Sequence, residues 1–238
     1  MCAIPLLWCC QGNGSAGSSS EQQSEATGND TTAPSPDDRV TNLSEKVRLL
    51  IEQYDINHDP HLIEQALTLN DSIQKIDTTQ QGQFNAAFTR AQLLAKSGHM
   101  REAMKIQEEL LKHNSDEFVR LQFYTGKYRM EGNIDSMHIC AREAITKCDK
   151  IIADSTQSFS AVDQALINKI YIYQIIDNRA KAKEANDLLA SRHKDDPNYQ
   201  ITDAQFNEDY NATRAALNQS AEEYRTQSAE KPQKPKTP

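Results

Sequence analysis

The residues best placed to do chemistry lie in one short segment. His58-Asp59-Pro60-His61 is followed by Glu64, and the spacing of His61 and Glu64 lets both side chains share one face of a helix, as two metal ligands would. The same residues also have a structural interpretation, because Asp59 can cap a helix and Pro60 suits its first turn. We favour this second interpretation, in which His58 closes the preceding turn, and we predict no metal site.

Sequence motifs of known catalytic chemistry are not found. There is no Gly-x-x-x-x-Gly-Lys phosphate loop, no Gly-x-Ser-x-Gly nucleophile elbow and no His-Glu-x-x-His pair. The acidic pairs Glu108-Glu109 and Asp195-Asp196 indicate solvated helix faces or ends. Cys148 and His138 lie on one predicted helix at a spacing that keeps them apart. We therefore predict neither catalysis nor a cofactor, and an enzyme of unrecognised class remains an alternative.

The five cysteines fall into two groups. Cys140 and Cys148 lie two turns apart on one predicted helix, roughly 12 Å at the helical rise, which is too far for a disulfide. We predict that both are small buried side chains. The other three are Cys2, Cys9 and Cys10, in an apolar N-terminal segment.

That segment, residues 1–10, is followed at once by Gly- and Ser-rich sequence, as at the end of a secretory signal. It is too short to span a bilayer, which needs about 20 apolar residues. Leu7-Trp8-Cys9-Cys10 resembles the lipobox of bacterial lipoproteins, with Cys10 as the lipid acceptor and Cys9 as the alternative. The resemblance implies anchoring to the outer membrane of a bacterial cell envelope, on its periplasmic or surface side.

Residues 1–10 have no basic region, so we interpret them as the remnant of a signal that starts upstream of Met1; an ordinary apolar N-terminus is the alternative. Residues 11–42 are rich in Gly, Ser, Thr and Asn and predict a disordered tether, and residues 230–238 predict a disordered basic tail. Asp30-Thr31-Thr32 in the tether resembles an acceptor of bacterial O-glycosylation, which makes Thr31 a candidate for that modification.

The middle of the chain predicts an all-α fold. It is almost free of helix breakers, and apolar residues recur at helical spacing without the alternation of strands. Gly98 and Gly132 each stand between two amphipathic stretches, 34 residues apart. Stacked pairs of helices repeat at this interval.

Gly98, Ala103 and Leu110, with Gly132 and Ala144, resemble the glycine and small-residue pattern of the tetratricopeptide repeat family. The match departs from the family at Met137, where a small residue is usual, and at Ala87, where an aromatic is usual. A third pair is predicted at 161–176 and 179–194, with Asp177-Asn178 at its turn, and an earlier pair at 45–54 and 60–76. We expect three to four hairpins over residues 43–200.

One further helix is predicted over residues 201–229, with Phe206, Tyr210, Leu217 and Tyr224 on one face. A terminal helix of this kind seals the last repeat of a solenoid with its apolar side.

The family resemblance implies a concave groove, lined by the first helix of each pair, that binds a peptide or another protein's helix. The groove positions carried over are Asn85, Phe88, Gln92, Lys96, Gln122, Arg129, Gln164 and Tyr171. We expect a membrane-tethered scaffold that binds another protein; a module that binds a saccharide or small molecule is the alternative. The net charge of −8 and the pI of about 5.3 argue against nucleic acid as a partner.

Overall fold

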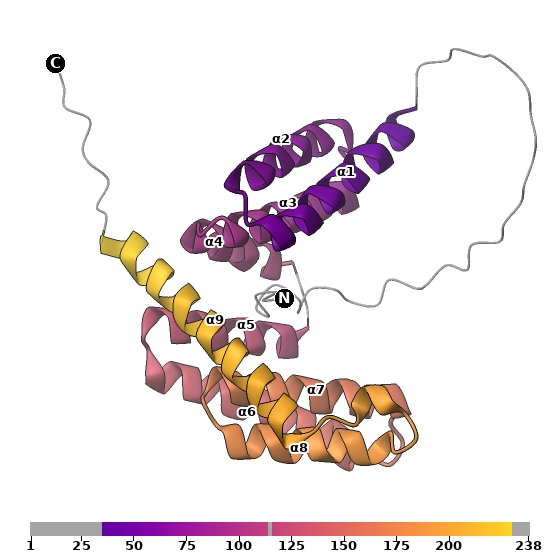
Figure 1. Ribbon diagram of the computed structural model, residues 1–238, viewed down its shortest axis with the longest axis vertical. Helices are drawn as coiled ribbons and strands as arrows, with labels where there is room; N and C mark the ends of the chain where they lie inside the picture. The colour runs from indigo at the N-terminus through magenta and orange to yellow at the C-terminus, as the bar shows by residue number, and fades with distance from the viewer. Residues whose placement is uncertain (1–34, 114–115, 230–238) are drawn as a thin grey trace, which may run out of the picture. The chain divides into compact units, whose positions relative to one another are not determined.

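The computed structural model describes residues 35–113 and 116–229, and every regular element in these ranges is a helix (Figure 1). The all-α prediction is therefore confirmed. Contacts divide the described residues into two compact units, 35–93 and 94–229, with the boundary inside α3. Cys9, Cys10 and Thr31 lie outside the described residues, as does the predicted basic tail.

The first unit begins with α1 (Pro36–Asn57). Ser35 accepts a hydrogen bond from the Asp38 amide at 3.1 Å, and the Asp38 carboxylate accepts one in return from the Ser35 amide at 3.3 Å. This reciprocal capping box, with proline in the first turn, starts the helix. Folded structure thus begins before residue 43, and the prediction of a disordered tether is wrong for residues 36–42.

The turn between α1 and α2 (Pro60–Ile76) forms as predicted. His58 ends α1 in the left-handed conformation, with φ of 54°, and the Asp59 carboxylate caps α2 by accepting from the His61 amide at 3.0 Å. The two helices form a hairpin whose core also receives Leu93 from α3 (Gln80–Lys96). The buried residues of this core are Val47, Ile63, Ala66, Ile73 and Leu93.

Polar contacts also hold α3 to α2. The buried Asn70 side chain donates to the Ala86 carbonyl at 3.0 Å, and Arg90 pairs with Asp71 at 2.6 Å. A buried amide without such a partner would cost about 1–3 kcal/mol, so this bond fixes how α2 and α3 meet.

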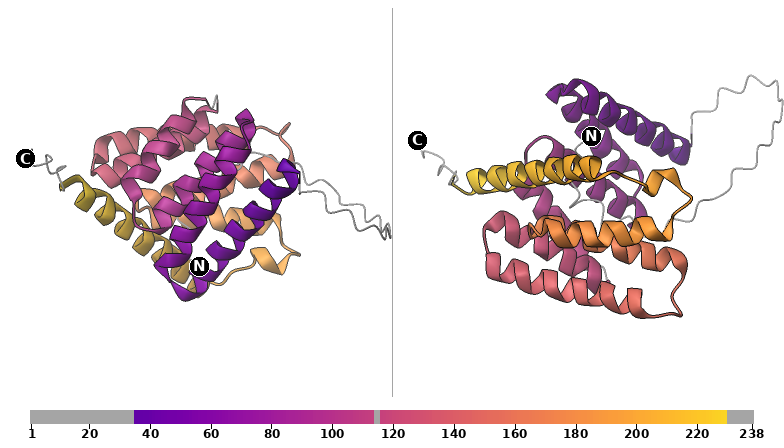
Figure 2. Two further views of the ribbon diagram at one scale, coloured as in Figure 1. Left: turned by 90° about the horizontal axis from the view of Figure 1, so that it is seen from above. Right: turned by 60° about the horizontal axis from the view of Figure 1, so that its bottom comes forward.

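The second unit contains three successive hairpin turns and a long final helix (Figures 1 and 2). Helices α5 and α6 form one hairpin, α7 and α8 form the next, and α6 packs against α7. A short 3-10 helix, η2 (Pro197–Tyr199), precedes the final helix α9 (Asp203–Ala229). The other bounds are α4 (Met100–Leu111), α5 (Glu117–Glu131), α6 (Ile134–Ala153), α7 (Phe159–Ile175) and α8 (Arg179–Arg192).

The three hairpin turns of this unit have the same backbone geometry. Gly98, Gly132 and Asp177 are left-handed, with φ of 79°, 76° and 60°. In each turn the next amide donates to a carbonyl five residues earlier at 2.8 Å, and the left-handed residue's own amide bonds a carbonyl three residues earlier. This is the Schellman pattern of helix ends, and it confirms that the predicted glycines and Asp177 occupy equivalent positions.

Small and apolar side chains just after each turn pack the hairpins together. Ala103, Met137 and Ala182 hold equivalent positions and are all buried, so the core accommodates a methionine at the second. Seven residues later, Ala144 and Leu189 are buried in the second and third hairpins. Within the described ranges, no helix is long and apolar enough to cross a membrane.

We predict that Gly132→Ala destabilises the chain by about 1 kcal/mol, because an L residue with a Cβ is strained in the left-handed region. No atom lies within 4 Å of the added Cβ, so the cost is confined to the backbone. Gly132→Asn is the control, because Asn tolerates this conformation better. Urea unfolding of both variants measures the difference; equal free energies of unfolding would refute the backbone explanation.

Candidate functional site

Helix α9 runs across all three hairpin turns of the second unit (Figure 1). We call the surface beneath it the turn face and define it by these residues at the turns that contact α9: Gly98, Arg101, Arg129, Glu131, Gln174, Ile175, Asp177 and Arg179. α9 begins on the last hairpin, as predicted for a terminal helix, and continues past it to α5 and α4.

The apolar side of α9 packs against the hairpins in two places. Phe206 and Tyr210 pack with Ala182 of α8, and Leu217 packs with Tyr171 and other apolar residues of the second and third hairpins. Phe206, Tyr210 and Leu217 are buried, as their common face predicted, whereas Tyr224 is only half-buried.

At the third turn, Asp177 is the principal polar contact of α9. Its carboxylate accepts from the Tyr210 hydroxyl at 3.1 Å and from Arg214 at 2.6 Å, and Arg214 also donates to the Gln174 carbonyl at 3.3 Å. Burial raises the pKa of Tyr210 to about 12, and the hydrogen bond to Asp177 acts in the same direction. The other two turns have glycine at this left-handed position, where an aspartate is strained. Asp177 has this backbone strain, and its side chain bonds to α9.

At the second turn, Arg129 joins three helices. Its guanidinium donates to the Ile175 carbonyl, which ends α7, at 2.6 Å and to the Asn218 side-chain oxygen of α9 at 2.6 Å. The Nε atom of Arg129 is buried without a hydrogen-bond partner. Burial lowers the pKa of Arg129, and the nearby positive charge of Arg214 lowers it further. The negative charge of Asp177 acts in the opposite direction and raises the pKa of Arg129.

At the first turn, α9 makes mostly neutral contacts. Gln227 donates to the Gly98 carbonyl and accepts from the Arg101 amide at 3.0 Å. The Arg101 guanidinium lies over the Tyr224 ring, 4.9 Å from its centre, and the Tyr224 hydroxyl reaches Glu131 at 3.3 Å. These contacts anchor the far end of α9.

The groove positions predicted on α5 and α7 do not share one open surface. Gln122 and Tyr171 are buried in the helical core, which corrects the prediction for these two residues. Arg129 contacts the chain's own α9. Gln164 is exposed and bonds Asn168 of the same helix at 3.1 Å. The prediction placed the groove on helix faces, whereas α9 uses the hairpin turns.

The remaining candidates lie on α3. Asn85 is exposed and accepts from Gln81 at 2.8 Å, while Phe88, Gln92 and Lys96 are half-buried. These four residues stay candidates for partner contact.

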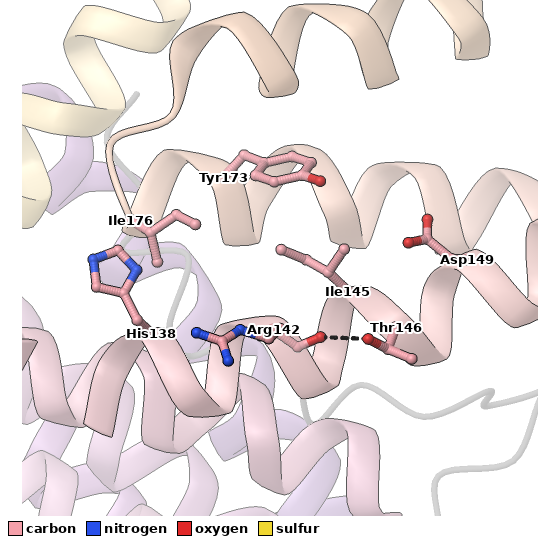
Figure 3. A pocket seen from close by; sticks show the side chains of 7 residues that line it. All are labelled: His138, Arg142, Ile145, Thr146, Asp149, Tyr173 and Ile176. Atoms are coloured by element: carbon pink, nitrogen blue, oxygen red, sulfur yellow. Dashed lines mark hydrogen bonds between the residues drawn. The ribbon is translucent and has the colours of Figure 1, made fainter. Parts of the chain in front are cut away.

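An open pocket of about 410 Å³ lies between α6 and α7 (Figure 3). Its ends differ: His138 and Arg142 lie near Ile176, and Asp149 lies beyond Tyr173. His138 and Asp149 are three helical turns apart, roughly 16 Å, so they do not converge as a catalytic pair would. Asp149 also pairs with Lys169 at 2.6 Å. With one aromatic ring the pocket does not form the aromatic-lined hollow typical of saccharide sites.

Within the described residues, the histidine and cysteine candidates from the sequence do not gather at one site. His61 and Glu64 are exposed, 3.2 Å apart, and Glu64 raises the pKa of His61. Across residues 35–113 and 116–229, no group of three or more His, Cys, Asp or Glu side chains is placed to hold a metal ion. Cys148 is buried, and burial raises its pKa to about 12, as expected of a packed thiol; Cys140 is half-buried.

Sequence reasoning missed the contacts that Asp177, Arg101 and Arg179 make with α9. Asp177 offered a signal, because an aspartate stands where the other two turns have glycine. The partners of Arg101 and Arg179 are more than 100 and about 28 residues away in sequence, so no local pattern reveals them.

We predict that Asp177→Asn lowers stability by about 1 kcal/mol, the range for a partly exposed ion pair. Asn keeps a left-handed backbone and an acceptor for Tyr210, so the loss reports the removed negative charge, which acts on Arg214 and Arg129. The same substitution in an Arg214→Gln background is the control. Urea unfolding of the wild type, the two single variants and the double variant gives the coupling free energy between positions 177 and 214. A coupling of zero would contradict this role for Asp177.

Comparison of the chain with known protein families, curated proteins and solved structures finds no match. The function proposed below therefore depends on the residues and their contacts alone.

Proposed function

We propose that the protein is a membrane-tethered scaffold of the bacterial cell envelope that binds another protein through a helix laid on its stacked hairpins. One observation supports this most strongly: the turn face already holds an amphipathic helix, α9, over three successive turns. A surface that accepts one amphipathic helix has the apolar seats and polar rim that helix recognition needs.

The surface has the composition of a helix-binding site. Tyr171 and Ile175 provide an apolar floor beneath Leu217, while arginines and carboxylates at the turns provide polar contacts around it. Aromatic and arginine anchors with a polar rim are typical of binding surfaces between proteins. This arrangement favours a binding role over catalysis or uptake of a small molecule.

The tether is proposed from the N-terminal sequence. An apolar segment ending at Cys9 and Cys10 supports lipid attachment, with Cys10 preferred because of its spacing from Leu7. A lipid anchor would restrict the scaffold to the membrane surface and raise its effective concentration for partners there.

We expect Cys10→Ala to abolish membrane association when the protein is expressed in a bacterial host from an extended start site. Detergent partitioning and intact-mass analysis measure it, and the wild-type protein should carry a mass increase of lipid size. Cys9→Ala is the matched control and should keep the lipid. Soluble, unmodified wild-type protein would refute the tether.

The partner-binding proposal is tested by photo-crosslinking in the native envelope. A photoreactive residue in place of Glu131, at the rim of the turn face, is expected to give an adduct with one discrete protein. Glu143, an exposed acidic residue on α6, is the control position and should give none. Equal labelling at both positions, or none at either, would refute a protein-binding surface here.

A further inference from the structure

Two arginines of the turn face meet neutral groups on α9. Arg129 donates to the side-chain oxygen of Asn218, and Arg179 donates to that of Asn207. A carboxylate at either position would form a charge-assisted hydrogen bond, which is shorter and stronger than a bond to a neutral amide. The pairing between α9 and its seat is therefore weaker than this surface allows.

The two asparagines lie on one flank of α9. Eleven residues separate them, which is three helical turns, so both side chains project in nearly the same direction. The two arginines come from different hairpins, one at the end of α5 and the other at the start of α8. A single helix laid on the turn face thus meets both cations with one edge.

The environment of Arg129 favours an anion. Its Nε atom is buried without a partner, and the positive charge of Arg214 lies nearby. Two carboxylates of the turn face bond to α9: Asp177 bonds to Tyr210 and Arg214, and Glu131 bonds to Tyr224. The hydrogen bonds of Arg129 go instead to the Ile175 carbonyl and the Asn218 amide oxygen, which are both neutral. Arg129 therefore has spare capacity for a negative charge that α9 does not provide.

We propose that the turn face is a binding site for an acidic amphipathic helix of a partner protein, which displaces α9 by placing carboxylates where α9 has Asn207 and Asn218. This inference rests on the proposed scaffold function and names the chemistry of its partner. α9 then binds the turn face more weakly than the partner helix does, and it covers the apolar residues that contact Phe206 and Leu217 until the partner binds. Partner binding releases α9.

The test uses labelled peptides of residues 203–229 and the full chain, with fluorescence anisotropy as the readout. The Asn207→Glu, Asn218→Glu peptide is expected to bind at least tenfold more tightly than the wild-type peptide.

A charge-matched control peptide carries Ala212→Glu and Gln219→Glu, both exposed positions on the outer side of α9. Each glutamate introduced in either peptide has an acidic residue four positions away, so the repulsion within the helix is matched. In the control peptide these neighbours are Glu208 and Glu223, and in the Asn207, Asn218 variant they are Asp203 and Glu222. This peptide should bind like the wild type, and a gain equal to that of the Asn207, Asn218 variant would overturn the proposal.

Arg179→Gln and Arg129→Gln in the full chain should each reduce the gain, and together abolish it. Arg179 is exposed, so its variant keeps the test valid if Arg129→Gln impairs folding. A gain in the Arg179→Gln protein as large as in the wild-type chain would overturn the proposal. If the glutamate peptide shows no gain in affinity but the photoreactive residue at position 131 still crosslinks one protein in the envelope, the acidic helix is refuted and the proposed scaffold function is not.

Discussion

The structure of the second unit depends on how each first helix ends. A left-handed residue after the helix reverses the chain and satisfies its last carbonyls, so that the second helix can begin at once and fold back. Glycine meets this requirement without strain at two turns, and Asp177 meets it at the third. Because the three turns share one geometry, they present a repeated surface along which a straight helix can run.

The same constraint explains why α9 lies where it does. Helix ends leave carbonyl groups unpaired by the helix, and arginine and glutamine side chains bond to them at the turns: Arg129 to Ile175, Arg214 to Gln174 and Gln227 to Gly98. These bonds tie the hairpins to α9 and to one another. The choice of aspartate at the third turn adds a charged contact that glycine could not make, at the cost of some backbone strain.

The fold was largely predictable because its signals are local. Helical periodicity, the cap Asp59 and the 34-residue spacing of Gly98 and Gly132 depend on neighbouring residues, and the structure confirms the hairpins they predicted. The start of α1 was missed because residues 36–42 were judged by their polar composition, whereas a capping box and a proline set the helix end.

The candidate site was less predictable, because it depends on contacts between distant residues. The pairs of Arg129 with Asn218 and Arg101 with Gln227 form only after three turns and α9 come together. Family resemblance placed Gln122 and Tyr171 in a groove, but both belong to the core. Whether a side chain is buried depends on how neighbouring helices pack against it, and the sequence pattern of a single helix does not determine that packing.

Amide hydrogen exchange of the full chain tests the central claim, that α9 occupies the turn face, most directly. We predict that backbone amides between Phe206 and Tyr224 exchange much more slowly than those of a free helix, because opening them requires breaking contacts to three hairpins. We also predict that Leu217→Asp speeds exchange along α9 while leaving the core of α6 protected. Exchange of α9 at the rate of an unpacked helix in the wild-type chain would contradict the account.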